Sequence, residues 1–509
     1  MISTLTRRID ALIDGTTMYR LVLYYLAGLL AIAALLAPFK LVPIDATAIV
    51  FSTVLIVAVS WLSNWLFAKV FRVPANVESA IITALIIALI MNPVVATDAA
   101  GVGGLVCASV WAIASKFIFA VRKKHIFNPA AIGVALSGLL IAQPATWWVA
   151  GNLTLLPFVL VGGLLIARKL QRFDMIGLFI VVNLATIALT NAAADVPQAL
   201  TETLTHSPLF FLAFAMLTEP LTAPQARWPR LAYAVIVGIL ASPTIHFGEF
   251  YLTPEIALLV GNVFAYVVSP KGRFALTLLR IEQAANGAYD FVFSPDRKLK
   301  FRPGQYLEWT LGFAHPDNRG NRRSFTIASS PTEDEVRLGV KFYPSASSFK
   351  RALAEMQPGD QIFATQLAGE FVLPRNPDTK LAFIAGGIGI TPFRSMIQYL
   401  IDRKEKRDIV TFYGNAESRD IAYKDVLDTA SDELGLKTVY AVAKEKQPAP
   451  GMHSGFIDEA LIRQQMPDFK ERVFYISGPH PMVALFQKTL RGMGVAHSHI
   501  KVDFFPGLA

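Results

Sequence analysis

The sequence contains a single cysteine, Cys107, among its 509 residues. One thiol cannot form a disulfide within the chain, and it cannot supply the ligands of an iron–sulfur cluster or of a cysteine-rich zinc site. Histidine is also scarce before residue 270, where His125, His206 and His246 all lie at the ends of apolar segments or between them. Haem held between membrane helices needs paired histidines inside the segments. We therefore expect neither haem nor a metal site.

Charged residues are few, at 17% of the sequence, and they are sparse before Pro270 and frequent after it. With a mean hydropathy of +0.45, the chain is too apolar for one soluble globule, yet it carries too many charges to lie wholly in a membrane. The net charge of +9 would suit a nucleic-acid-binding protein. However, the basic residues of the first half stand at the ends of apolar segments, where they act as topology signals. The composition predicts a membrane half, a soluble half and no nucleic-acid partner.

Ten apolar segments precede Pro270, and we expect about ten membrane spans. The first is long enough to cross a bilayer and no small-residue cleavage site follows it, so a cleavable signal is not expected. The third, fifth and eighth are the shortest, well below the roughly 20 residues of a straight span, which is typical of helices broken inside a membrane. The segments are 20–39, 47–68, 79–91, 101–121, 129–142, 153–167, 175–191, 208–218, 231–246 and 254–269.

Alternating the sides of the membrane from an N-terminus placed inside puts nearly all basic residues of this half on one side. Only Lys40 falls on the other side, together with Asp45, Asp98, Asp195, Glu202 and Glu249. Basic loops stay in the cytoplasm, so we expect a multi-pass protein of the inner (cytoplasmic) membrane with its C-terminal half in the cytoplasm. The basic residues are Arg7, Arg8, Arg20, Lys69, Arg72, Arg122, Lys123, Lys124, Arg168, Lys169, Arg172, Arg227, Arg230, Lys271 and Arg273.

Four proline motifs form a weak internal repeat. Met91-Asn92-Pro93 closes the third segment and Thr218-Glu219-Pro220 closes the eighth, while Asn128-Pro129-Ala130 opens the fifth and Thr253-Pro254-Glu255 opens the tenth. Any one of them is explained as a helix end. Four in matched order predict two inverted halves, with a site where the broken segments meet. Helix ends there are expected to offer unpaired N–H and C=O groups to a ligand around Asn128, Pro129, Thr218 and Pro220.

Three stretches of this half resemble the membrane subunits shared by the sodium-pumping NADH:quinone reductase (its B subunit) and the Rnf complex (its D subunit). They are residues 124–133, 214–224 and 255–262. The resemblance implies flavin inside the membrane. In those relatives one of the flavins, an FMN, is bonded covalently to a threonine of a Ser/Thr-Gly-Ala-Thr string. This chain lacks the string, and the nearest match is Leu184-Ala185-Thr186. We therefore expect FMN or riboflavin held without a covalent bond.

The soluble half begins with short alternating segments separated by Gly, Pro, Asn and Asp, which predict a small β-barrel. After Arg375 a strand-then-helix rhythm indicates an α/β nucleotide-binding layout. The expected domains are therefore 1–271 in the membrane, a 272–374 barrel and a 375–509 α/β domain. The predicted barrel strands are 274–281, 288–293, 305–311, 323–328, 336–342 and 361–366.

Arg323, Phe325 and Thr326 suit a flavin dinucleotide. Arg323 offers a permanently charged fork for a pyrophosphate, Phe325 an aromatic face for the isoalloxazine ring, and Thr326 a hydroxyl for the N5 region. Ser347 and Ser348 precede a predicted helix over 349–356, whose free N–H groups could receive the same pyrophosphate.

A glycine-rich turn follows the predicted strand 381–385. Glycines at 386, 387 and 389 allow close approach of phosphates, and a helix opens at Thr391-Pro392. Such a turn alone is weak evidence, because it can be a mere tight turn. Ser477-Gly478-Pro479, after the predicted strand 473–476, adds a second loop at the carboxyl ends of the same sheet. Gly386, Gly387, Gly389, Thr391, Pro392, Gly478 and Pro479 are the candidate nicotinamide-binding residues.

Residues 272–509 resemble the ferredoxin–NADP reductase family. Its Arg-x-Tyr/Phe-Ser/Thr motif corresponds to Arg323 to Thr326, and its Cys-Gly-Pro loop to Ser477 to Pro479, with serine in place of cysteine. The resemblance implies FAD, NADH or NADPH, and catalytic roles for Thr326 and Ser477. It also implies that Asp420 binds the adenosine ribose and favours NADH, although Arg419 beside it argues for NADPH. Phe505 and its neighbour Phe504 would cover the flavin, but adjacent aromatics near a terminus equally suit packing.

Three functions fit these features. The first is an NAD(P)H-dependent flavin oxidoreductase that passes electrons through FAD and a membrane flavin to an extracytoplasmic acceptor, such as a flavin-bearing protein. The second keeps the same entry but ends on membrane quinone. The third is a transporter or ion channel that the attached reductase regulates.

Overall fold

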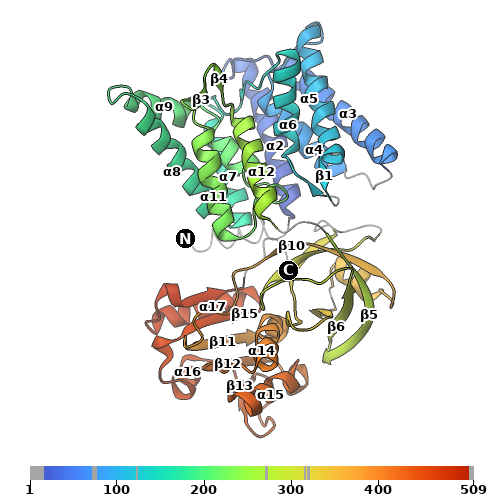
Figure 1. Ribbon diagram of the computed structural model, residues 1–509, viewed down its shortest axis with the longest axis vertical. Helices are drawn as coiled ribbons and strands as arrows, with labels where there is room; N and C mark the ends of the chain where they lie inside the picture. Colours follow the sequence, from blue (N-terminus) through green and yellow to red (C-terminus); the bar gives the residue numbers. More distant parts are fainter. Residues whose placement is uncertain are drawn as a thin grey trace. The chain divides into compact units, whose positions relative to one another are not determined.

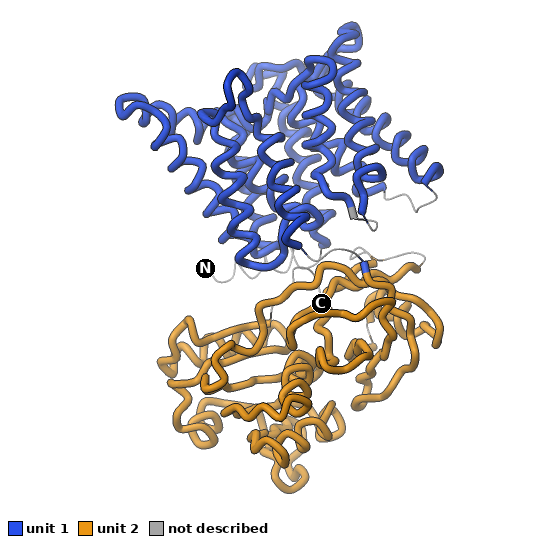
Figure 2. The backbone as a smooth tube through the Cα atoms, in the orientation of Figure 1, with its two compact units in different colours: residues 1–273 blue, residues 274–509 orange. Residues whose placement is uncertain are grey.

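The computed structural model describes residues 16–71, 77–121, 124–269, 273–313, 317, 321–344 and 346–503. The chain divides into two compact units, Met1–Arg273 and Phe274–Ala509 (Figure 2), close to the expected boundary at residue 272. Of the residues used above, Arg7, Arg8, Arg72, Arg122, Lys123, Lys271, Phe504 and Phe505 lie outside the described ranges.

Within its described residues, the first unit is built from helices. Each of the ten predicted apolar segments contains one, and α9 is a further, more polar helix that the prediction omitted. The elements are α2 (Met18–Leu36), α3 (Ala46–Val70), α4 (Val77–Ile90), α5 (Ala99–Ile118), α6 (Pro129–Ile141), α7 (Leu156–Leu170), α8 (Phe173–Thr190), α9 (Val196–His206), α10 (Leu209–Phe211) with the π-helical turn Leu212–Met216, α11 (Arg227–Leu240) and α12 (Pro254–Val268).

Four of the described helices are long and apolar enough to cross a membrane: α2 with the turn that follows it, α3, α5 and α8. Helices α4, α6 and α12 are apolar but shorter. The chain is therefore a membrane protein by these helices, while the count of ten crossings and the inverted repeat stay predictions. Two short hairpins connect helices, β1 (Ala120–Val121) with β2 (Lys124–His125), and β3 (His246–Phe247) with β4 (Phe250–Tyr251). The hairpin β3–β4 and α9 lie at one end of this unit and β1 at the other (Figure 1).

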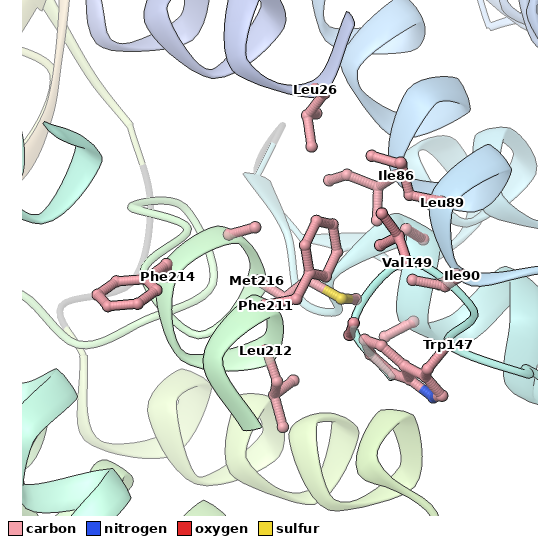
Figure 3. Packing of buried hydrophobic residues seen from close by; sticks show 14 of the residues in the cluster. Leu26, Ile86, Leu89, Ile90, Trp147, Val149, Phe211, Leu212, Phe214 and Met216 are labelled. Carbon is pink, nitrogen blue, oxygen red and sulfur yellow. The ribbon is translucent and has the colours of Figure 1, made fainter. Parts of the chain in front are cut away.

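The core of the first unit lies where α4 ends. Helix α4 is apolar on all sides and buried from Ala84 to Ile90, as expected for a helix surrounded by others. Figure 3 shows Ile86, Leu89 and Ile90 next to Trp147 and Phe211. The carbonyl of Ile90 accepts the backbone N–H of Trp147 at 2.9 Å. The chain after α6 thus closes the end of α4 and satisfies one of its last carbonyls.

The second unit begins with the predicted barrel sheet, in the antiparallel strand order β8-β7-β10-β5-β6-β9. The core inside it is formed by alternating apolar side chains such as Leu276, Trp309 and Leu338. Its elements are β5 (Phe274–Ala285), β6 (Ala288–Pro295), β7 (Tyr306–Thr310), β8 (Arg322–Thr326), β9 (Val336–Lys341), α13 (Ser348–Ala354) and β10 (Gln361–Ala368).

The rest of the unit is a parallel sheet with the order β14-β13-β12-β11-β15-β16. Strand β11 is buried along its whole length, which is typical of a central parallel strand. From β11 the chain adds β12 on one side and later returns to add β15 on the other side. In such sheets ligands bind in the crevice where the strand order reverses, which here lies between β11 and β15. The elements are β11 (Leu381–Gly386), α14 (Thr391–Arg403), β12 (Ile409–Asn415), α15 (Lys424–Leu434), β13 (Lys437–Val442), β14 (Met452–Ser454), α16 (Glu459–Gln465), β15 (Val473–Ser477), α17 (His480–Gly492) and β16 (Ile500–Val502).

Candidate functional site

Arg323 and the start of α13 converge on one carboxylate. The Arg323 side chain is 3% exposed, and its Nη2 lies 3.4 Å from Oδ1 of Asp317. The backbone N–H of Ser348 donates to the other oxygen of Asp317 at 3.0 Å. A guanidinium and a backbone N–H that share one anion can also share a pyrophosphate, which is bound by the same charge-assisted hydrogen bonds. The residues present therefore fit the FAD pyrophosphate expected here.

Two other predicted flavin residues have structural contacts of their own. The Ser347 hydroxyl accepts the backbone N–H of Lys350 at 3.3 Å and so caps α13. The Phe325 ring lies 5.9 Å from the ring of Phe349, in the barrel core. A cofactor contact from either residue stays a prediction.

Asp503, which the sequence analysis missed, joins the two candidate catalytic hydroxyls. Its Oδ2 accepts a hydrogen bond from Ser477 at 3.1 Å and a longer one from Thr326 at 3.5 Å. Thr326 ends β8 in the barrel and Ser477 ends β15 in the parallel sheet. Burial raises the pKa of Asp503 to about 7, and the two hydroxyl donors oppose that shift. The carboxylate thus links the end of β8 to the end of β15.

The glycines of the two nicotinamide loops allow these loops to touch. Strands β11 and β15 pair in parallel, with Ala385 opposite Ser477. A Cβ on Gly389 would lie 2.6 Å from the Cα of Gly478, and a Cβ on Gly386 would lie 2.3 Å from Sδ of Met482. Both loops therefore lie at the carboxyl edge of the sheet as expected. Thr391 and Pro392 begin α14 and are buried, while Pro479 directly precedes α17.

Asp420 faces the barrel. Its side chain is 10% exposed, and its Oδ1 lies 3.1 Å from Nζ of Lys341 on β9. Its other oxygen accepts the backbone N–H of Glu417 at 3.3 Å. Arg419 is 70% exposed and pairs with Glu417. The carboxylate predicted to bind ribose is thus already engaged by an ammonium and a turn, and its role toward the nucleotide stays a prediction.

The predicted membrane site is a polar junction around the carboxylate of Glu219. That carboxylate accepts hydrogen bonds from Asn128 and Thr222 at 2.9 Å each, and His125 lies 3.3 Å away. The backbone N–H of Asn128 donates to Asn262 on α12 at 2.8 Å. The junction brings together the Asn128-Pro129-Ala130 motif and the Thr218-Glu219-Pro220 motif.

The groups at this junction are bonded to one another. Asn128 caps the N–H of Ala131 at 3.0 Å, and the Thr218 hydroxyl donates to the carbonyl of Phe214 at 2.7 Å. Asn128 and Thr218 are buried, while Pro220, which follows Glu219, is half-buried. Asn128 thus satisfies one N–H at the start of α6, as an N-cap side chain does, and a ligand at these helix ends stays a prediction.

No group of three or more His, Cys, Asp and Glu residues with metal-binding spacing occurs in the described part of the chain.

Comparison with known proteins separates the same two parts. Residues 150–270 match the model described as the NQR2, RnfD, RnfE family, and residues 383–488 match the one described as the oxidoreductase NAD-binding domain. The chain therefore contains a segment of the NQR2, RnfD, RnfE family and an oxidoreductase NAD-binding segment. We call the unit Phe274–Ala509, which contains the second segment, the ferredoxin reductase-like domain.

The curated relatives match less than half of this chain. A flavohemoprotein of Pseudomonas putida is 27% identical over 239 residues, covering 46% of this chain and 59% of that protein. A glycine betaine monooxygenase reductase subunit of Chromohalobacter salexigens is 24% identical over 241 residues, covering 46% of this chain and 64% of that protein. The chain thus spans less than two thirds of these relatives.

Solved structures match over a similar extent. One is the FAD/NAD-binding domain of nitric oxide dioxygenase from Vibrio cholerae, at 18% identity and a TM-score of 0.40, covering 46% of this chain and 98% of that one. Another is a ferredoxin NADP+ reductase from Neisseria gonorrhoeae, at 19% identity and a TM-score of 0.40, covering 45% of this chain and 98% of that one.

Arg323→Ala should empty the flavin site of the ferredoxin reductase-like domain. The change removes a buried charged donor, and bonds of that kind contribute about 1.5 to 3 kcal/mol each. FAD released from the purified variant should fall well below that of the wild type. Arg322→Ala, which removes the adjacent arginine that pairs with Glu308, is the matched control and should keep its FAD. Full FAD content in Arg323→Ala would refute the assignment.

Asp503→Asn should change how stability depends on pH. The folded pKa of Asp503 is about 7 against an ordinary value of 3.8, so between these values the folded chain holds a proton that the unfolded chain has lost. The free energy of unfolding contributed by this group is therefore highest at low pH and falls as the pH rises toward about 7. The neutral amide lacks this dependence. The melting temperature of the ferredoxin reductase-like domain in the variant, relative to the wild type, should therefore be higher at about pH 8 than at about pH 5. The same relative melting temperature at both pH values would contradict the pKa shift.

Proposed function

We propose that this protein is a membrane-bound NAD(P)H-dependent flavin oxidoreductase. It takes a hydride from NADH or NADPH at the ferredoxin reductase-like domain and passes electrons through FAD to a flavin in the membrane domain. The electrons then leave to an acceptor on the extracytoplasmic side, such as a flavin-bearing protein. FAD suits the entry point because it accepts two electrons together and can release them singly.

One observation carries the proposal. Thr326 from the flavin motif and Ser477 from the nicotinamide loop both donate to the carboxylate of Asp503. A reductase needs the two ligands in contact, since hydride transfer demands reacting atoms about 3 to 3.5 Å apart. The shared carboxylate supports that meeting point. Arg323 and the N–H of Ser348 would hold the flavin pyrophosphate, and the glycines of the β11 turn would admit the nicotinamide dinucleotide.

The membrane part of the proposal rests on the family of residues 150–270 and on the helices of the first unit. Its flavin would be FMN or riboflavin held without a covalent bond, because the threonine string of the resembling subunits is missing. The positive-inside pattern supports a cytoplasmic ferredoxin reductase-like domain and an inner-membrane location.

Flavin counting tests both sites at once. Full-length protein should release more than one flavin per chain on acid denaturation, and peptide mass spectrometry should find no flavin attached, including on the peptide that contains Thr186. The Arg323→Ala variant should lose only the FAD and keep the membrane flavin. Detection of a flavin-modified threonine would show that the membrane flavin is bound covalently. An Arg323→Ala variant that contains no flavin would show that the membrane domain holds none, and the proposed path would lose its membrane carrier.

Asp420→Ala should relax a preference for NADH. The change removes a carboxylate that would repel a 2′-phosphate, and it frees the ammonium of Lys341, so both effects favour NADPH. The ratio of kcat/KM for NADPH to that for NADH should rise on the order of tenfold, since close like charges near a surface cost roughly 1 to 4 kcal/mol. Asp432→Ala, an exposed change on α15, is the control. An unchanged ratio would show that Asp420 does not influence nucleotide choice.

A further inference from the structure

Helix α14 is tied directly to the loop that follows the flavin motif. This β8–β9 loop, residues 327–335, leaves the barrel next to Thr326. Arg394, one turn into α14, donates to the carbonyl of Ala328 at 3.1 Å. The next residue, Ser395, donates to the carbonyl of Ser329 at 2.6 Å. Two successive residues of the helix therefore satisfy two successive carbonyls of the loop.

An ion pair reinforces this connection. The Arg394 side chain is 8% exposed and forms two hydrogen bonds with the carboxylate of Glu333, one of them at 3.0 Å. The same carboxylate accepts the backbone N–H of Ser330, so Glu333 fixes the loop while it holds the arginine. Bidentate arginine–carboxylate pairs fix orientation as well as distance. The pair thus sets how α14 lies against the loop.

A glycine allows the two parts to approach closely at the same place. A Cβ on Gly339 of β9 would lie 2.7 Å from Cγ2 of Thr391 and 2.5 Å from the hydroxyl of Tyr423. Tyr423 in turn donates to Asp290 of β6. The first residue of α14 is thus seated on the barrel through a position that no larger side chain could occupy unchanged.

We propose that Arg394, acting with Glu333, is a positioning residue that fixes the start of α14 relative to the flavin motif and so sets the distance for hydride transfer. The inference rests on the proposed function. In that reaction NAD(P)H would become NAD(P)+ as its hydride leaves, and FAD would accept the hydride whole, the hydrogen together with both electrons, to give FADH⁻. The glycine turn and the first turn of α14 hold one reactant, and the residues around Thr326 hold the other. Arg394 touches neither reacting atom, but it joins the two segments that do.

The test uses the full-length protein in detergent, mixed with NADH without oxygen while flavin absorbance is followed. Arg394→Met should lower the limiting rate constant of the first flavin-reduction phase about tenfold or more, because small misplacements of reacting groups have effects of that size. FAD content and the apparent Kd for NADH should stay within about twofold of the wild type. Arg463→Met, which removes a half-exposed arginine–glutamate pair on α16, is the matched control and should leave all three unchanged.

A second readout does not depend on turnover. Without NADH, the Arg394→Met variant should show faster hydrogen–deuterium exchange than the wild type in residues 327–335 and in the first turn of α14. The Arg463→Met variant should show wild-type exchange in both segments. Glu333→Gln should slow flavin reduction similarly, and the double variant should be little slower than either single one, as expected for two residues acting as a unit.

The outcomes separate the inference from the proposed function. If neither NADH nor NADPH reduces the FAD of the wild-type protein, the proposed function is refuted. Hydrogen–deuterium exchange would still test the contact between α14 and the β8–β9 loop. A limiting rate constant for Arg394→Met within about twofold of the wild type would overturn the positioning role, as would an effect confined to NADH affinity. If Arg394→Met fails to fold or loses FAD, Ser395→Ala and Arg394→Lys replace it, since each removes part of the same contact. They should show a smaller drop of the same kind, and normal rates in both would refute the inference.

Discussion

The reductase half depends on one seam, where the barrel meets the parallel sheet. Each ligand motif belongs to a different layer: Arg323 to Thr326 end a barrel strand, and the glycine turn follows β11. Neither layer alone can bring a flavin and a nicotinamide together. Under the proposed function the seam would do so through polar contacts that fix direction, namely Arg394 to Glu333 and the two hydroxyls on Asp503. Because hydrogen bonds are directional and hydrophobic contacts are not, such a seam suits a reaction sensitive to small displacements.

The membrane half depends on a different constraint, the pairing of polar groups at the ends of its helices. In surroundings without water, each helix end must find partners inside the protein. At the Glu219 junction Asn128 caps α6 and also meets the Glu219 carboxylate, as do His125 and Thr222, which is three residues from Glu219. The Glu219 side chain is 21% exposed, and a carboxylate largely shielded from water is costly unless several donors surround it. The junction therefore holds the start of α6 to the segment that follows the π-helical turn.

Local pattern was sufficient to predict much of this organisation. Apolar runs located the helices, alternation located the barrel strands, and glycine and proline spacing located the two loops that follow β11 and β15. The convergence of Arg323 and Ser348 could also be foreseen, because each motif carries its own chemistry. Asp503 could not, since it is 177 residues from Thr326 and its only local signal was its position just before Phe504 and Phe505. Asp420 was assigned from its turn alone, whereas its partner Lys341 is 79 residues away in the barrel. The bonded state of the Glu219 junction likewise depends on contacts 91 and 94 residues apart.

In the proposed path, electrons enter at the ferredoxin reductase-like domain and leave on the other side of the membrane. Full-length protein in sealed liposomes, with that domain facing outward, tests it directly. NADH is added outside, and ferricyanide, which does not cross the bilayer, is enclosed within. The account predicts that enclosed ferricyanide is reduced in proportion to the NADH oxidised, and that Arg323→Ala abolishes both. Oxidation of NADH that leaves the enclosed ferricyanide untouched, and proceeds only with an outer acceptor or an added quinone, would contradict it.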